Sequence, residues 1–242
     1  IGNDRTGPWL ITCDHAANTI PPTISNGDLG ISAYDMNRHI AFDIGAAGVS
    51  KRLGELLDAP VVLSNFSRLV IDPNRGEDDP TLLMQLYDGT VIEGNRGMDS
   101  TEREKRLNLC YRPYHDELSR LTAQATPDAI YVAIHSFTPQ LNARTPRPWE
   151  IAILYSERDA RYSRKLLERL RCETGLCIGD NEPYHGELAG DSVQRHALDR
   201  GRHNTLIEIR NDLIETEAGQ ARWAALLAEV AGQVKVALNN SE

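Results

Sequence analysis

Short runs of β-branched and other apolar residues alternate along this chain with longer segments whose apolar residues recur at helical spacing. The short runs predict buried strands at residues 9–13, 60–63, 68–71, 129–134, 150–155 and 204–209. The longer segments predict amphipathic helices at residues 41–57, 100–122, 159–174 and 217–238. Strands separated by helices require crossover connections. The pattern therefore predicts an α/β fold with a mostly parallel or mixed central sheet and helices on both faces.

Two stretches depart from this regular alternation. In the helix expected at 100–122, Ser100 or Thr101 is suited to the N-cap and Glu104 to a capping box. Pro113 lies inside the same run, and its missing N–H group predicts a kink or a split there. Residues 76–97 are polar and rich in Gly, Pro and Asp, which predicts a long loop or lid.

The length and composition of the chain limit the number of domains and the kinds of partner that we expect. The 242 residues show no repeat and no linker, so we expect one domain over residues 1–242. A formal charge of −9 argues against nucleic acid or an acidic membrane surface as a partner, but not against a small anion in an arginine-lined pocket. No apolar run of about 18 residues predicts a membrane span. The four cysteines follow neither a zinc nor a disulfide spacing, which is typical of reduced thiols in a cytoplasmic protein.

Polar residues follow several of the predicted strands at the point where each strand ends. In sheets of this kind, ligands bind beyond the carboxyl ends of the strands. The polar groups are DHAAN (14–18), DPNR (72–75), HSFT (135–138) and EIRND (208–212). Together they predict one site that contains two histidines, several carboxylates and arginines.

His15 and His135 are the candidate metal ligands among these residues. Neutral imidazole is a common zinc ligand, and a catalytic zinc site needs three protein ligands and one position for water. The alternative is that each histidine caps a helix or packs in the core.

The third ligand is open between two residues. Asn18 lies three residues after His15, where a glutamate would be a better ligand. Asp43 lies one helical turn after His39, so it either reaches the metal or pairs with His39 on the surface.

Glu208 is the candidate general base because it is a lone carboxylate on the apolar strand 204–209. Burial of a carboxylate is costly without a partner, and the same burial raises its pKa toward a useful range. The alternative is a buried structural ion pair with Arg210 or Arg75.

Arginine side chains are suited to bind a substrate carboxylate, because the guanidinium group can donate two parallel hydrogen bonds to it. Arg75 follows a predicted strand directly, and Arg147 lies in the rigid turn PRPW (146–149). Arg68 and Arg210 are weaker candidates for the same role. Arg68 or Arg147 is also suited to stabilise an oxyanion.

Several motifs, spread in consistent order over nearly the whole chain, resemble those of the N-formylglutamate amidohydrolase family. They are CDHAAN (13–18), FDIGA (42–46), SRLVIDPNR (67–75), HSFTP (135–139), RPW (147–149), DNEPY (180–184) and EIRND (208–212). The resemblance implies a metal-dependent amidohydrolase that acts on a small anionic N-acyl amino acid, with N-formylglutamate as the leading substrate. It also places Ser136, beside His135, among the substrate-binding residues.

The chain is also distantly similar to zinc carboxypeptidases. This likeness implies a zinc-exopeptidase-like (phosphorylase/hydrolase-like) fold and a Zn²⁺ ion, or another divalent metal, held by His15 and His135. It further implies a carboxylate grip by Asn74 and Arg75 and a general base at Glu208. The sequence departs from the pattern at Asn18, where the carboxypeptidases have a glutamate.

Two other kinds of function are compatible with these residues. One is a carboxypeptidase or a cell-wall peptide amidase, which would need a longer groove. The other is a small-molecule-binding protein that keeps the fold but has lost the metal, which the asparagine at position 18 favours.

Overall fold

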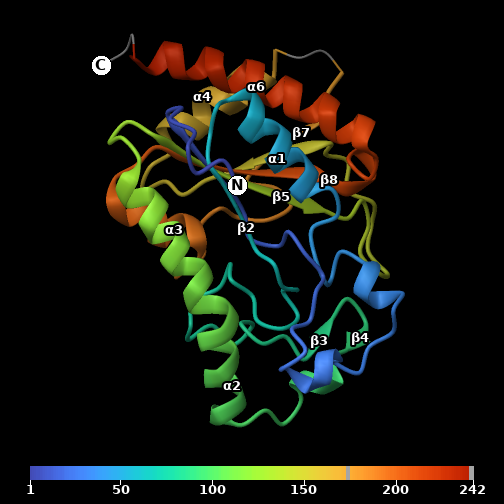
Figure 1. Cartoon of the computed structure of the whole chain (residues 1–242). Coiled ribbons are helices and arrows are strands. Elements are labelled where there is room, and N and C mark those ends of the chain that lie inside the picture. Colours follow the sequence, from blue (N-terminus) through green and yellow to red (C-terminus); the bar gives the residue numbers. More distant parts are fainter. Residues whose placement is uncertain (173–174, 240–242) are drawn as a thin grey trace.

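A six-stranded sheet forms the centre of the protein in this computed structural model, which describes residues 1–172 and 175–239 (Figure 1). The strand order is β2-β1-β5-β8-β6-β7. Neighbouring strands are parallel except β6 and β8, which are antiparallel. The strands are β1 (Trp9–Cys13), β2 (Val61–Leu63), β5 (Ile130–Phe137), β6 (Ile151–Leu154), β7 (Ile178–Asp180) and β8 (Asn204–Arg210). The prediction of an α/β fold with a mixed, mostly parallel sheet is confirmed.

Helices cover both faces of this sheet, as the pattern predicts. On one face α1 (Ala46–Leu56), α4 (Arg161–Leu170) and α6 (Glu217–Asn239) pack on Ile11, Val132 and Ile207 (Figure 1). On the other face, α3 (Arg112–Gln124) and the short α5 (Ser192–His196) pack on Leu10, Tyr131 and Leu206. The two sets of strand residues alternate, because successive side chains of a strand point to opposite faces.

Much of the chain between β1 and β5 extends beyond the sheet on the side of α3. It includes α2 (Ser100–Arg106) and a small hairpin of β3 (Leu86–Tyr87) and β4 (Thr90–Val91), which lies well away from the central strands (Figure 1). The hairpin occupies the segment predicted as a loop. Its strands have two residues each, which is too short to produce a periodic pattern.

The strand predicted at residues 68–71 is wrong. This apolar run is buried, but it forms a turn in which the Val70 N–H donates to the Ser67 carbonyl at 2.9 Å. Side chains bind its carbonyls: Asn95 donates to Leu69 and Arg106 to Val70. A short apolar run is buried in either structure, so its composition does not distinguish a strand from a core turn.

Several predicted helix ends also differ in the structure. α1 begins at Ala46, after Gly45 with φ 80°, rather than near residue 41. α2 has Asp99 as its N-cap, and this carboxylate accepts the Glu102 N–H, in place of the predicted Ser100 or Thr101. The end predicted for the helix 159–174 lies at residue 174, outside the described residues.

The predicted interruption near Pro113 is confirmed. A π-helical turn, Leu107–Tyr111, separates α2 from α3, and Pro113 lies in the first turn of α3. Proline has no N–H group and crowds the carbonyl of the preceding turn, so the chain widens just before it.

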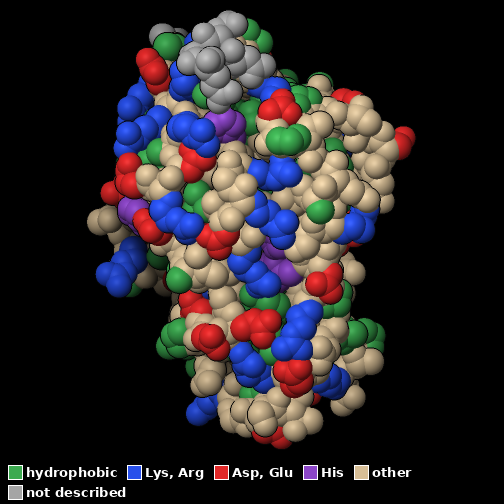
Figure 2. Space-filling view, turned by 90° about the vertical axis from the view of Figure 1, so that its left-hand side faces the viewer, with side chains coloured by type: hydrophobic (Ala, Val, Ile, Leu, Met, Phe, Trp, Pro, Cys, Tyr) green, Lys and Arg blue, Asp and Glu red, His purple; other side chains and the backbone are tan. Residues whose placement is uncertain are grey.

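The surface carries both charge signs. Figure 2 shows basic and acidic side chains interspersed over one face, with hydrophobic side chains in small groups between them. Among the described residues, no helix is long and apolar enough to cross a membrane.

Candidate active site

A cavity of about 350 Å³ opens at the carboxyl ends of β1, β5 and β8, on the sheet face that α3 and α5 cover. His135 and Glu208 reach it from directly paired positions of β5 and β8. Loop residues complete its wall. The polar lining includes His15, His39, Asp43, Arg68, Asn74, Arg75, Tyr87, His135, Ser136, Thr138, Tyr184, His185, Glu187, Asp191 and Glu208.

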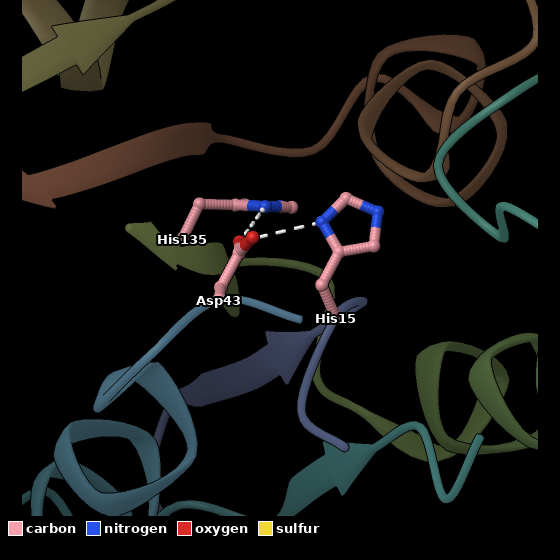
Figure 3. A group of neighbouring side chains, drawn as sticks. All are labelled: His15, Asp43 and His135. Carbon is pink, nitrogen blue, oxygen red and sulfur yellow. Dashed lines mark hydrogen bonds and ion pairs between the residues drawn. The ribbon is translucent and has the colours of Figure 1, made fainter. Parts of the chain in front are cut away.

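Two imidazoles face one carboxylate at the base of this cavity (Figure 3). His15 Nδ1 lies 3.3 Å, and His135 Nδ1 2.9 Å, from Oδ2 of Asp43. The ring centroids are 5.0 Å apart, and the possible ligand atoms of all three residues lie within 4.8 Å of one another. Direct ligation places each nitrogen about 2.1 Å from zinc, so this spacing suits a metal ion shared by the three side chains.

The far nitrogen of each ring is held by a further buried carboxylate. His15 Nε2 lies 2.7 Å from Asp72 Oδ1, and His135 Nε2 lies 3.2 Å from Asp14 Oδ2. Metal-binding histidines in proteins commonly have their second nitrogen fixed in this way, which sets the orientation of the ring. The arrangement therefore leaves Nδ1 of each ring as the atom available to a metal.

Asp14 is itself held in place from α3 and α5. Its Oδ1 accepts the hydroxyl of Tyr114 at 2.6 Å and that of Ser192 at 2.9 Å. Burial alone would raise the pKa of Asp14, but the hydrogen bond and charge of His135 lower it to about 2. Asp14 is thus an anion that fixes His135.

Four carboxylates are buried at this cavity or directly behind its histidines: Asp14, Asp43, Asp72 and Glu208. Against the effect of burial, Asp14 and Asp43 raise the pKa of His135, so positive charge at that ring balances part of theirs. Arg68 is the nearest guanidinium, 3.5 Å from Asp43 Oδ1 and 2.7 Å from Asp72 Oδ2. A divalent cation that replaces the protons on the imidazoles would balance the same carboxylates, so the donor set fits such an ion.

Electrostatics at Asp43 agree with this fit. Burial would raise the pKa of Asp43, but the neighbouring His15 and His135 hold it well below its usual range. The side chain is therefore ionised, which is the form that binds a metal.

Of the two candidates for the third ligand, Asp43 lies with the two histidines and Asn18 does not. Asn18 donates its amide to the Met36 carbonyl at 2.8 Å and lies outside the cavity lining. Asp43 does not pair with His39, whose Nε2 lies 3.4 Å from Asp88 instead. The segment before α1 is not helical, so the predicted one-turn spacing of His39 and Asp43 does not apply.

Glu208 lies in the cavity, and it forms no salt bridge with any of residues 1–172 or 175–239. Its side chain is 7% exposed, and its Oε2 atom is buried with no hydrogen-bond partner in the described part of the chain. The predicted structural alternative is not formed, because Arg210 binds Asp212 and Arg75 binds Thr81. Burial raises the pKa of Glu208 to about 7, against the opposing charge of His135.

Arg75 presents a positive charge to the same cavity. Its Nε donates to the Thr81 hydroxyl at 3.0 Å and its Nη1 to the Asn74 carbonyl at 2.8 Å. Both acceptors are neutral, and no carboxylate of residues 1–172 or 175–239 lies within ion-pair distance of it. Asn74 is fixed in turn, since its N–H donates to Asp72 and its Oδ1 accepts the Ser192 N–H.

The other predicted arginines have different surroundings. Arg147 lies behind the cavity wall, where it donates to the Thr138 carbonyl and the Tyr184 hydroxyl. Its guanidinium lies 5.6 Å from the ring of Phe137 and 5.0 Å from that of Tyr184. Arg210 does not line the cavity.

Ser136 lines the cavity, and its backbone supports the candidate metal ligand. Its N–H donates to Asp43 Oδ2 at 3.2 Å, while its hydroxyl donates to the Ile44 carbonyl at 2.9 Å. The structure thus brings Ser136 next to Asp43.

The spacing of apolar residues does not identify several of the residues that line this cavity. Tyr87 comes from the β3–β4 hairpin, and residues 184–188 and Asp191 come from the segment between β7 and α5. These segments lack periodicity. Their one signal was composition, since both are rich in glycine and polar residues.

Comparison with known proteins places the chain in a family. The sequence model of the N-formylglutamate amidohydrolase family matches residues 7–215, which is most of the chain. The chain belongs to this family. The resemblance of the motifs is therefore confirmed, and the cavity at the end of the sheet is the cavity of an amidohydrolase-family protein.

Named relatives and solved structures agree with this placement. The N-formylglutamate deformylase of Pseudomonas putida is 27% identical over 226 residues, covering 84% of this chain and 79% of the relative. The gene product Atu2144 of Agrobacterium tumefaciens, at 36% identity, has a TM-score of 0.92 and covers 99% of this chain and 94% of its own. The N-formylglutamate amidohydrolase of Ralstonia eutropha JMP134 is 20% identical with a TM-score of 0.68 over 98% of this chain and 96% of its own, which indicates a shared fold.

Proposed function

We propose that this protein hydrolyses the amide of N-formyl-L-glutamate, or of a close analogue, to formate and glutamate. The observation that carries the proposal is that His15, Asp43 and His135 meet in the same cavity as Glu208, whose Oε2 has no hydrogen-bond partner among the described residues. Membership of the N-formylglutamate amidohydrolase family and the names of the two Pseudomonas deformylases support the choice of substrate.

We assign the three-residue cluster to a divalent metal, with Zn²⁺ as the leading candidate. Two imidazole nitrogens and one carboxylate are a usual catalytic donor set for zinc. Bound there, such an ion supplies Lewis acidity toward the scissile carbonyl and the attacking water. Asp72 and Asp14 would keep the two rings oriented toward it.

Glu208 is the general base in this proposal. Its pKa of about 7 lets it accept a proton from the attacking water near neutral pH and return that proton to the leaving nitrogen. The wall of Leu154 and Leu206 beside it keeps the carboxylate away from bulk water.

Arg75 and Asn74 are the proposed carboxylate grip. The uncompensated guanidinium of Arg75 attracts an anionic substrate, and a two-pronged contact fixes the position of the amide relative to Glu208. Arg68 is held between Asp43 and Asp72, and we assign its remaining N–H groups to the oxyanion. Arg147 stays one layer further out, where it supports Tyr184 in the cavity wall.

The alternative of a binding protein that has lost its metal rested on Asn18. Since Asp43 supplies a carboxylate between the two histidines, Asn18 no longer argues for that loss. The alternative of a peptidase or cell-wall amidase requires a long groove, whereas this site is a cavity of about 350 Å³.

The proposal is tested by measuring formate and amino acid release from a series of N-acyl amino acids. The protein is first stripped of metal and then assayed with and without added Zn²⁺. We expect zinc-dependent cleavage of N-formyl-L-glutamate and much weaker cleavage of N-formyl amino acids that have a neutral side chain. A metal-loaded protein that cleaves none of these amides would refute the proposal.

A further inference from the structure

The π-helical turn between α2 and α3 places one tyrosine hydroxyl against the backbone of the proposed carboxylate grip. Tyr111, the last residue of the turn, is fully buried. Its hydroxyl donates to the Arg75 carbonyl at 2.6 Å and accepts from Arg195 Nη1 at 2.6 Å. Such turns recur at functional sites in other proteins.

The widened turn has an identifiable cause and consequence. The Arg112 N–H donates to the Leu107 carbonyl, five residues back, just before Pro113. One additional residue in the turn changes the direction in which the following side chain points. The ring of Tyr111 packs 4.3 Å from that of His115, which holds it against α3.

Arg195 decides the direction of the hydrogen bond to Arg75. A guanidinium can only donate, so the Tyr111 oxygen is the acceptor in that contact. The single hydroxyl hydrogen is then directed to the Arg75 carbonyl. Arg195 also lies over the Tyr111 ring, 5.4 Å from its centroid, so both the ring and the hydroxyl are fixed.

The loop that carries Arg75 is joined to α5 by this contact and by a neighbouring one. The Ser192 N–H binds the Asn74 side chain, and Arg195, from the same helix, binds Tyr111. Within the described part of the chain, the Arg75 side chain donates hydrogen bonds to Thr81 and to the carbonyl of Asn74, which belong to the same loop. Tyr111 therefore links this loop to the rigid helices.

We infer that Tyr111 is a positioning residue that sets Arg75 for the substrate carboxylate. Without its hydroxyl, the guanidinium keeps its charge but loses a fixed direction, so substrate binding weakens, while the bond-breaking step at the formyl amide, which Glu208 is proposed to catalyse, is little changed. This inference rests on the proposed function, because Arg75 is taken there as the carboxylate grip.

The test compares Tyr111→Phe with a matched control, Tyr162→Phe. Tyr162 is also fully buried, but it lies on α4 at the opposite face of the sheet, and its hydroxyl has no partner in the described chain. We expect Tyr111→Phe to raise KM for N-formyl-L-glutamate about three- to tenfold, the usual effect of one lost hydrogen bond, with kcat within about twofold. Tyr162→Phe should change neither constant.

A double-mutant cycle with Arg75→Met separates positioning from general loss of structure. In the Arg75→Met background, Tyr111→Phe should no longer lower kcat/KM, because no guanidinium remains to be positioned. Equal effects in both backgrounds, or a fall in kcat instead of a rise in KM, would overturn the inference.

Binding of glutarate, a dicarboxylate without an amide, is measured by calorimetry on the same variants. If the wild type binds glutarate and Tyr111→Phe weakens it, the inference stands even when N-formyl-L-glutamate is not cleaved, and only the proposed function fails. If the wild type cleaves N-formyl-L-glutamate but Tyr111→Phe binds glutarate as well as the wild type, the inference fails and the proposed function stands. If the wild type neither cleaves nor binds, both fail.

Discussion

At the scale of single residues, the directions of the side chains at the end of β1 determine which of them reach the candidate site. Asp14 continues the alternation of Leu10 and Thr12, so it points to the same sheet face as His135 and Glu208. His15 would point to the opposite face if the strand continued. The strand ends at Cys13, and the turn after it brings His15 round to Asp43.

Arg75 gives the first prediction. Arg75→Lys replaces a planar two-pronged donor by a point charge, so the substrate carboxylate is held less firmly. We expect KM for N-formyl-L-glutamate to rise about tenfold or more, the effect of roughly 1.4 kcal/mol, with a smaller change in kcat. Steady-state kinetics measures both constants, and an unchanged KM would remove Arg75 from the binding site.

The residues of the site were predictable where a strand positions them. His135 and Glu208 follow from the alternation of β5 and β8, and both line the cavity. The choice between Asn18 and Asp43 could not be made from spacing. Asp43 comes from a non-helical segment, and its Oδ2 receives the Ser136 N–H, a contact that no local pattern reveals.

At the scale of elements, α3 and α5 meet through a pair of buried histidines. His115 Nδ1 and His196 Nε2 are 2.9 Å apart, and the rings stack at 17°. Burial, together with the charge of Arg195, lowers the pKa of His115 to about 3 and that of His196 to about 4. Both side chains are therefore neutral in the folded protein at neutral pH.

This pair predicts a loss of stability in acid. A histidine in the unfolded chain has a pKa of about 6.5. Between about pH 6.5 and about pH 4, both histidines are therefore protonated in the unfolded chain but still neutral in the folded protein. As the pH is lowered through this window, the free energy of unfolding should decrease by up to about 1.4 kcal/mol per pH unit for each histidine.

Urea unfolding at several pH values measures this slope. The variant His115→Asn/His196→Asn should be less stable at pH 7 but should show a shallower fall between pH 6.5 and 4. A variant with the same slope as the wild type would mean that other groups cause the acid sensitivity.

The longer elements were predictable from their periodicity, and the short β2 (Val61–Leu63) from its apolar run. The strands that became β1, β5, β6 and β8, and the helices that became α3 and α6, are long enough to show a period. β7 and the β3–β4 hairpin have only two or three residues each and were missed. The run 68–71 shows the opposite error, since its apolar residues are buried by a turn.

At the scale of the whole molecule, the candidate metal ligands connect parts that are distant in the chain. His15 follows β1, Asp43 precedes α1 and His135 belongs to β5. A metal ion held by all three would bind the folded chain but not the unfolded one, in which these residues are far apart. Metal binding should therefore stabilise the entire fold.

Thermal unfolding tests this prediction. Zinc at about 100 times its Kd should add roughly 2.7 kcal/mol to the free energy of unfolding and raise Tm by about 5–10 °C for a domain of this size. Chelation should reverse the shift. The His15→Ala variant is the control and should show little or no shift, whereas an equal shift in both proteins would place the metal elsewhere.

Glu208 lies in the cavity, and its Oε2 has no hydrogen-bond partner among the described residues. The decisive measurement is formate release from N-formyl-L-glutamate per bound metal ion in the Glu208→Gln variant. This change keeps the shape of the side chain but removes its capacity to accept a proton. We predict a fall of about 10²–10⁴-fold, with metal content and Tm close to those of the wild type. Full turnover in a metal-loaded Glu208→Gln protein would contradict the mechanism.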